Sequence, residues 1–171
     1  MDSINNRRSV RSYLPKKVTK SDIELLLKAA MQAPSAKNQQ AWFFIVVTKR
    51  TTLKALAQTS PYAKMLNEAP LALVLLTDLT KLISPKMYPQ DMAAATQNIL
   101  LTATSLGLGS CWLGVYGHLD RMVATKKVLQ TADHLEPFSI VALGYPTNAN
   151  ALYYINRYDE KKVLWEEENY A

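Results

Sequence analysis

A cluster of arginines near the N-terminus is the strongest candidate for chemistry in this sequence. Arg7, Arg8, Ser9 and Arg11 fall within five residues. Guanidinium groups make planar, charge-assisted hydrogen bonds, so a cluster of this kind suits a phosphate dianion. Short basic runs are also typical of a mobile, solvated arm. The cluster alone leaves both interpretations open.

Two other segments place polar groups or glycine beside apolar runs. Residues 34–40 (PSAKNQQ) form a polar stretch that leads through Ala41 into the apolar run WFFIVV. Short donors and acceptors on such a loop can read the edge of a planar ring, although an ordinary helix-to-strand connection has the same composition. In the segment Trp112-Leu113-Gly114, the glycine would let the backbone come close to a ligand.

Other classes of site lack their sequence signatures. His118 and His134 lie in predicted loops without metal-ligand spacing, so we expect no metal site. The sequence contains no GxxxxGK[ST] loop, no GxGxxG motif and no paired-carboxylate motif. Cys111 is the only cysteine, and its apolar surroundings predict a buried, inert thiol. We therefore assign no catalytic side chain and expect a reducing, cytoplasmic location.

Length and composition predict one globular domain over residues 1–171, with 49% hydrophobic and 20% charged residues. The longest aliphatic run, residues 71–76, is too short to cross a membrane, and no apolar export segment follows the first arginines. Residues 1–54 contain 11 Lys/Arg and 3 Asp/Glu, which concentrates the net charge of +6. Such an excess suits nucleic acid, anionic lipid or a phosphorylated small molecule. Nucleic acid is the weakest of these, because no basic stripe with interleaved aromatic residues occurs.

Hydrophobic periodicity predicts alternating helices and strands around four core strands, with helices on both faces. A helix is expected from Thr19, with an Asp22 capping box, to just before Pro34. Strands are expected over 42–48, 71–78 and 138–143, the first two buried and central because both faces are apolar. Residues 109–116 are expected to form a strand or a strand-like turn. The other expected helices are 51–59, 62–68, Asp91 to Leu106, and Leu119 to Thr131 with Met122, Val123, Val128 and Leu129 facing inward.

Two elements point to contacts outside a single chain. The helix expected from Asp91 to Leu106 is apolar or small almost all round, and a helix without a polar face is buried on several sides. A subunit interface is one explanation. The tail from Ala149 carries Trp165 and several tyrosines but no core of its own, so we expect it to dock onto another surface.

Four segments, in this order, resemble the nitroreductase family of FMN-dependent oxidoreductases: RRSVRSYLP, APSAKNQQAW, QNILLTATSLGLGSCWLG and ALGYP. The resemblance implies an α+β fold whose mainly antiparallel central sheet has four to five strands flanked by helices. It also implies an intimate homodimer that binds two FMN molecules at its interface. The C-terminal tail, from about residue 150, would be exchanged between the subunits.

The resemblance carries family FMN contacts onto positions of this chain. The phosphate and ribityl chain of FMN would be held by the N-terminal residues Arg7, Arg8, Ser9 and Arg11, together with Arg157, which matches the late phosphate-binding arginine. The loop that the family typically supplies to the flavin from the opposite subunit matches Pro34, Ser35, Ala36, Asn38 and Gln40. The backbone groups that approach the isoalloxazine ring match Trp112, Leu113 and Gly114. Lys64 and Asn67 are candidates for a lysine that some relatives place near the flavin pyrimidine.

The activity that the resemblance implies is ping-pong hydride transfer. NADH or NADPH reduces FMN and leaves, and the reduced flavin then reduces a nitroaromatic, a quinone or a similar small acceptor. The chain departs from the family at Ala41, where proline is common, and over residues 79–90, where larger relatives carry helices that shape the acceptor pocket. Lid residues expected of a dehalogenase or a flavin-fragmenting enzyme are missing. The alternative function is a non-catalytic flavin carrier or sensor.

Overall fold

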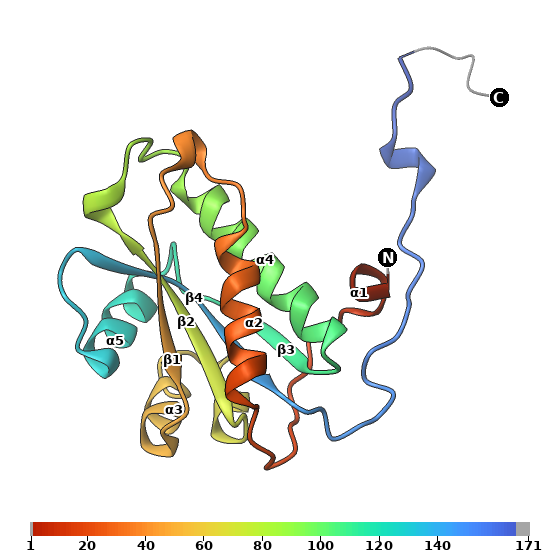
Figure 1. Cartoon of the computed structure of the whole chain (residues 1–171), viewed down its shortest axis with the longest axis horizontal. Helices are drawn as coiled ribbons and strands as arrows, with labels where there is room; N and C mark the ends of the chain where they lie inside the picture. The colour runs from red at the N-terminus through yellow and green to blue at the C-terminus, as the bar shows by residue number, and fades with distance from the viewer. Residues whose placement is uncertain (1, 167–171) are drawn as a thin grey trace.

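A four-stranded sheet forms the centre of the computed structural model, which describes residues 2–166. The strands are β1 (Trp42–Val47), β2 (Leu71–Asp78), β3 (Gly109–Gly114) and β4 (Leu135–Gly144). Their order is β1-β2-β4-β3, and every neighbouring pair is antiparallel (Figure 1). The predicted α+β fold with a mainly antiparallel sheet is confirmed.

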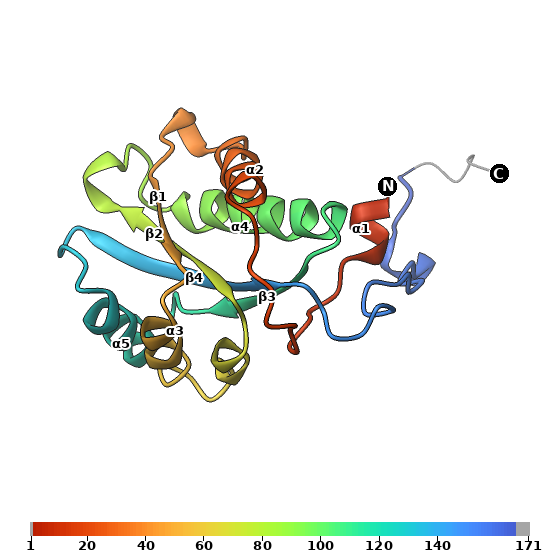
Figure 2. The ribbon, with the colours of Figure 1, turned by 60° about the horizontal axis from the view of Figure 1, so that its bottom comes forward.

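Helices cover both faces of this sheet (Figure 2). The helices α2 (Lys20–Met31) and α4 (Tyr88–Ser105) lie on one face, while α3 (Arg50–Leu56) and α5 (Leu119–Leu129) lie on the other. The short helix α1 (Asp2–Asn6) lies near the C-terminal end of α4. Single 3₁₀ turns occupy Ala36–Asn38, Lys64–Asn67, Leu79–Lys81 and Glu160–Lys162.

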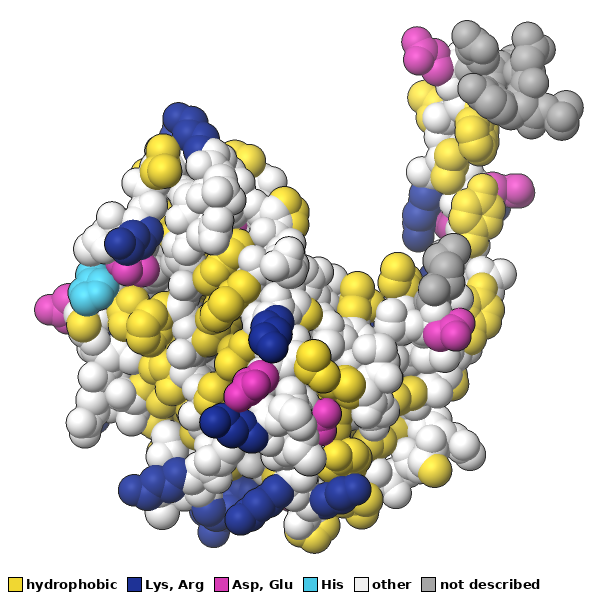
Figure 3. Space-filling view, viewed as in Figure 1, with side chains coloured by type: hydrophobic (Ala, Val, Ile, Leu, Met, Phe, Trp, Pro, Cys, Tyr) yellow, Lys and Arg dark blue, Asp and Glu magenta, His cyan; other side chains and the backbone are white. Residues whose placement is uncertain are grey.

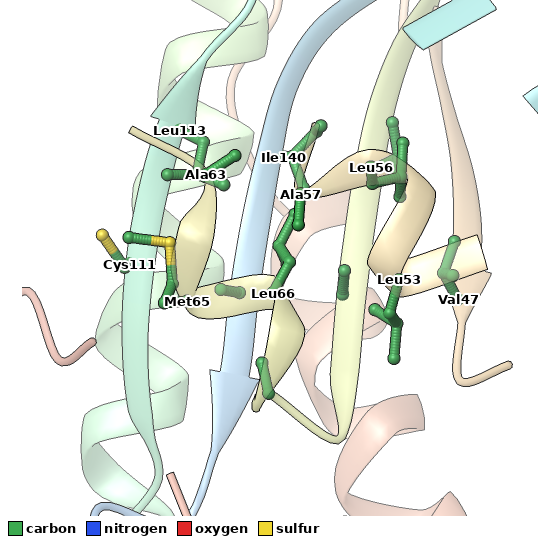
Figure 4. Close-up of a cluster of buried hydrophobic side chains, with 14 of the residues drawn as sticks. Val47, Leu53, Leu56, Ala57, Ala63, Met65, Leu66, Cys111, Leu113 and Ile140 are labelled. Carbon is green, nitrogen blue, oxygen red and sulfur yellow. The ribbon is translucent and has the colours of Figure 1, made fainter. Parts of the chain in front are cut away.

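The strand β2 divides the core into two clusters because its side chains alternate between the two faces. Leu71, Leu73 and Leu75 pack with residues of α2 and α4. Ala72, Val74 and Leu76 belong to the opposite cluster, which Figure 4 shows around Leu56, Leu66, Leu113 and Ile140. The prediction of a buried central strand over 71–78 is therefore confirmed.

The matching prediction for residues 42–48 was wrong, because β1 lies at the edge of the sheet. Phe43 is 45% exposed and Val46 is 42% exposed. Trp42, Phe44 and Ile45 are only partly buried against the two clusters. The apolar pattern on both faces of β1 therefore does not indicate a central strand. The outer edge of β1 has no strand partner within the described residues.

The helices confirm some of the capping and burial predictions and contradict others. The Thr19 hydroxyl accepts a hydrogen bond from the Asp22 backbone N–H at 3.1 Å, which confirms the predicted start of α2. Asp91 does not cap α4, which begins three residues earlier at Tyr88 with Pro89 in its first turn. In α5, Met122, Val128 and Leu129 pack against the core as predicted, but Val123 is 58% exposed.

The C-terminal segment leaves the body of the protein as an extended arm (Figure 1). Ala151 and Leu152 still pack against the core, whereas Tyr158 and Leu164 are 70% and 96% exposed. Hydrophobic side chains cover much of this arm in Figure 3. No helix among residues 2–166 is long and apolar enough to cross a membrane.

Candidate functional site

The N-terminal segment after α1 is fastened along the edge of β3. The backbone N–H of Val10 donates to the carbonyl of Ser110 at 2.9 Å, and that of Leu14 donates to the carbonyl of Tyr145 at 2.8 Å. Burial raises the pKa of the Tyr13 phenol, whose hydroxyl donates to the Val10 carbonyl at 2.5 Å. The cluster predicted as a mobile arm or an anion site is therefore held in place on the sheet.

This attachment brings residues from both ends of the chain to one cavity of about 480 Å³. Arg8, Ser9 and Arg11 line it from the N-terminal side, and Arg157 lines it from the tail. No Asp or Glu lines this cavity, and among residues 2–166 none forms an ion pair with these arginines. An electropositive cavity without a carboxylate suits an anionic ligand.

Arg8 carries unsatisfied donors at this cavity. Its Nη1 donates to the carbonyl of Arg7 at 2.7 Å, and its guanidinium lies 4.5 Å from the centre of the Tyr153 ring. Its Nε and Nη2 are buried without a hydrogen-bond partner in the described structure. Buried donors are costly when unpaired, so two orphaned guanidinium nitrogens fit the oxygens of a phosphate.

A second cavity of about 590 Å³ adjoins the first, because Arg11 lines both. Its wall includes the predicted segment Trp112, Leu113 and Gly114, and a side chain at Gly114 would meet nothing within 4 Å. Lys64 lines this cavity and Asn67 does not. The open space at Gly114 therefore fits the predicted approach of a planar ligand to the backbone.

Several residues of this second cavity were missed by sequence reasoning. Tyr62, Glu68 and Arg121 line it, and Arg121 Nη1 donates to the carbonyl of Gly114 at 3.0 Å. The Arg121 guanidinium lies 5.5 Å from the centre of the Tyr62 ring. Arg121 belongs to α5, where a single arginine after an acidic residue has no signal that separates it from an ordinary surface cation.

Cys111 lines the same cavity but has the properties of a structural thiol. It is buried among Met65, Leu113 and other apolar residues, as Figure 4 shows. Burial raises the pKa of this thiol. The direction of this shift agrees with the predicted inert cysteine. No group of three or more potential metal ligands occurs within residues 2–166.

The remaining predicted site residues lie elsewhere. Arg7 lines a neighbouring cavity of about 320 Å³ that it shares with Arg8 and Arg157. Neither of the two larger cavities is lined by any residue of the 34–40 loop. This loop is hydrogen-bonded to Asp91 near the start of α4. At the other end of α4, α1 lies beside Thr104 and Ser105, and the arginine segment pairs with Ser110 just beyond that end. The part of α4 between Asp91 and Ser105 spans about 21 Å.

Comparison with known proteins identifies the fold and the family. A family profile described as "Nitroreductase family" matches residues 4–60 and 57–145. An Archaeoglobus fulgidus protein is 44% identical over 151 residues, which cover 88% of this chain and 87% of that protein. Its name describes a candidate NADH dehydrogenase/NAD(P)H nitroreductase.

Solved structures agree with this match. A candidate NADH oxidase from Clostridium acetobutylicum superimposes with a TM-score of 0.94 at 47% identity, covering 97% of this chain and 99% of that one. A candidate nitroreductase from Desulfovibrio desulfuricans, described in complex with FMN, has a TM-score of 0.81 at 26% identity, with coverage of 96% and 94%. The matched sequence and the shared fold together show that this chain belongs to the nitroreductase family.

Proposed function

We propose that this protein is an FMN-dependent oxidoreductase that uses NADH or NADPH and reduces a nitroaromatic, a quinone or a similar small acceptor. Family membership and the relatives named for NAD(P)H and FMN support the reaction class. One structural observation carries the cofactor proposal. Arg8, Arg11 and Arg157 line a single cavity, and two buried nitrogens of Arg8 lack partners in the described structure.

We propose that the two adjoining cavities bind different parts of FMN. Arg8, Ser9, Arg11 and Arg157 would hold the phosphate and ribityl end, and Arg7 would add positive charge from the neighbouring cavity. Trp112, Leu113 and Gly114 would face the ring system beside Lys64. Bound FMN would supply hydride chemistry in two half-reactions, first with NAD(P)H and then with the acceptor.

We further propose that the working unit is a homodimer whose sites combine residues of both subunits. The loop residues Pro34, Ser35, Ala36, Asn38 and Gln40 lie about four helical turns along α4 from the arginine segment, a spacing that favours contacts with the flavins of two different sites. A second subunit can bring its own copy of this loop to the site. The extended arm beyond residue 150, with its exposed apolar side chains, would dock on that subunit.

Reconstitution with FMN tests the cofactor proposal. We expect the purified protein to retain FMN after desalting and to show the flavin absorption bands. Anaerobic addition of NADH or NADPH should bleach these bands, and a quinone or nitroaromatic should restore them. Protein that retains no flavin would refute the proposal.

Stopped-flow absorbance separates the enzyme from a carrier or sensor on the same fold. An enzyme should be reduced by NAD(P)H at a rate that matches or exceeds its steady-state turnover. Parallel double-reciprocal plots at several acceptor concentrations would support the ping-pong order. Tightly bound FMN that NAD(P)H reduces only over minutes would favour the carrier.

A further inference from the structure

The 34–40 loop has an unusual backbone that its own residues do not explain. Lys37, Asn38 and Gln40 have positive φ angles of 52°, 53° and 44°. Asparagine tolerates this region, but lysine and glutamine rarely adopt it, and such strain persists only where surrounding structure enforces it. The loop must therefore be held in this conformation by contacts with other parts of the protein.

Gln39 and Asp91 provide that hold. Gln39 is the only fully buried residue between Pro34 and Gln40, and Asp91 is 7% exposed. The Gln39 Nε2 donates to Asp91 Oδ2 at 2.5 Å, and the Ala36 backbone N–H donates to Asp91 Oδ1 at 3.0 Å. Both carboxylate oxygens of Asp91 are thus engaged by the loop.

The other end of the Gln39 side chain extends the connection to a third segment. Its Oε1 accepts hydrogen bonds from the backbone N–H groups of Ile83 and Ser84, both at 2.9 Å. One buried amide therefore joins the loop, the connection after β2 and the first turn of α4. Every polar atom of the two side chains has a partner, and fully satisfied buried networks of this kind favour one conformation.

We call the hydrogen-bonded pair of Gln39 and Asp91 the clamp. The polar side chains on either side of Gln39 take no part in the clamp and are free to contact a ligand. Asn38 and Gln40 are exposed, and Gln40 Nε2 donates to Asn38 Oδ1 at 2.7 Å. The Gln40 backbone N–H donates to the Ser35 hydroxyl at 3.2 Å.

We infer that Gln39 and Asp91 are positioning residues that hold the 34–40 loop in its flavin-binding conformation without touching the flavin. This inference rests on the proposed function, because that function makes the loop a flavin contact. The assignment is new for both residues, neither of which matched a family FMN position in the sequence.

The hydrogen-bond polarity of the clamp allows a sharp test. In Asp91→Asn, the new amide can accept from Ala36, but its N–H groups then face the N–H groups of Gln39. Rotating Gln39 would turn its N–H groups toward those of Ile83 and Ser84. Asp91→Asn combined with Gln39→Glu restores a donor at position 91 and acceptors at position 39, so every bond can form again.

We expect Asp91→Asn to weaken FMN binding about tenfold in a fluorescence titration, because it leaves buried donors unpaired. The double variant should bind within about threefold of wild type. Hydrogen exchange of the flavin-free protein supplies a second readout: the amides of Ala36, Ile83 and Ser84 should exchange faster in Asp91→Asn and slowly again in the double variant. Asn98→Ala is the matched control, since it removes a bond from α4 to the Ala29 carbonyl of α2 but leaves the clamp intact.

The outcomes separate this inference from the proposed function. Wild-type protein that binds no FMN refutes the proposed function, and the exchange data still report on the clamp. Wild-type binding with unchanged affinity in Asp91→Asn refutes the positioning role. A double variant as weak as Asp91→Asn, or an Asn98→Ala variant equally weak, would also overturn it, because charge or general stability would then be the cause.

Discussion

Arg8 shows how one side chain combines structural and binding contacts. It packs against Tyr153 and bonds to the Arg7 carbonyl, so it is partly fixed before any ligand arrives. Its free Nε and Nη2 are already desolvated. A ligand anion would therefore gain two charge-assisted hydrogen bonds at a small ordering cost.

Arg8→Ala should weaken FMN binding by about 1.5–3 kcal/mol, or about ten- to hundredfold, because it removes these donors. Isothermal titration calorimetry would measure the change. Lys20→Ala is the control, since Lys20 is an exposed cation whose only ion pair in the described structure is with Glu24. Equal effects of the two substitutions would show that net charge, and not the cavity, attracts the flavin.

Tyr13 predicts how stability depends on pH. Burial raises the pKa of Tyr13 in the folded protein, while in the unfolded chain a tyrosine ionises near about pH 10. Above that pH the unfolded chain binds fewer protons than the native protein, so stability falls as pH rises. Below that pH, Tyr13 is protonated in both the folded and the unfolded chain, so it causes no change of stability with pH.

We expect urea unfolding to show a decline in the free energy of unfolding above about pH 9–10, to which Tyr13 contributes up to about 1.4 kcal/mol per pH unit. Tyr13→Phe should be less stable at pH 7, because the Val10 carbonyl loses its donor, yet should decline less steeply in alkali. An unchanged alkaline slope would show that Tyr13 ionises normally in the folded protein.

At the scale of elements, two glycines of β3 have different roles that a sequence cannot separate. A Cβ at Gly109 would lie 2.7 Å from Val10 Cγ1, so this glycine permits the N-terminal segment to lie against the strand. At Gly114 a Cβ would meet nothing within 4 Å. One position is filled by the protein itself, and the other is open for a ligand.

Gly109→Ala should therefore destabilise the flavin-free protein by about 1–3 kcal/mol through overpacking. Gly114→Ala should leave that stability nearly unchanged and weaken FMN binding. Thermal unfolding without FMN and a flavin titration would separate the two effects. A stability loss at Gly114, or unimpaired binding there, would contradict the assignment of Gly114 to the ligand.

Local sequence patterns predicted where the helices and strands lie, but not which elements lie next to one another. Short apolar runs located all four strands, and the Thr19 cap located α2, because these signals act over a few residues. Strand order depends on contacts between distant segments, so WFFIVV looked central although it forms an edge. Asp91 resembled a helix cap because its partners, Ala36 and Gln39, lie more than 50 residues away.

In the candidate site, too, some residues could be predicted from local sequence patterns and others depend on how distant segments pack. The predicted residues Arg8, Ser9, Arg11 and Arg157 meet at one cavity because the N-terminal segment is fastened beside β3 and the tail passes it. Arg121 and Tyr62 could not be predicted, since their place at the second cavity depends on how α5 and the turn before Lys64 pack over the sheet. The 34–40 loop was predicted as a ligand contact, and in the proposed homodimer it would serve the site of the other subunit.

At the scale of the whole molecule, the positions of the cavity and the loop constrain how the proposed homodimer would be arranged. The arginine cavity includes Ser9, which pairs with Ser110 just beyond the C-terminal end of α4, and the 34–40 loop lies near the N-terminal end of that helix. If both serve one flavin, the cavity of one subunit must receive the loop of the other. Each homodimer would then contain two composite sites.

Subunit complementation tests this arrangement with two damaged chains. Arg8→Ala impairs the cavity and Asp91→Asn impairs the loop, so both homodimers should bind FMN weakly. A heterodimer prepared with two affinity tags would combine an intact cavity with an intact loop at one site and both defects at the other. At an FMN concentration between the wild-type and variant Kd values, it should bind about half the wild-type flavin. Sites built within one chain would instead give heterodimers no better than the two parents, because every site would keep one defect.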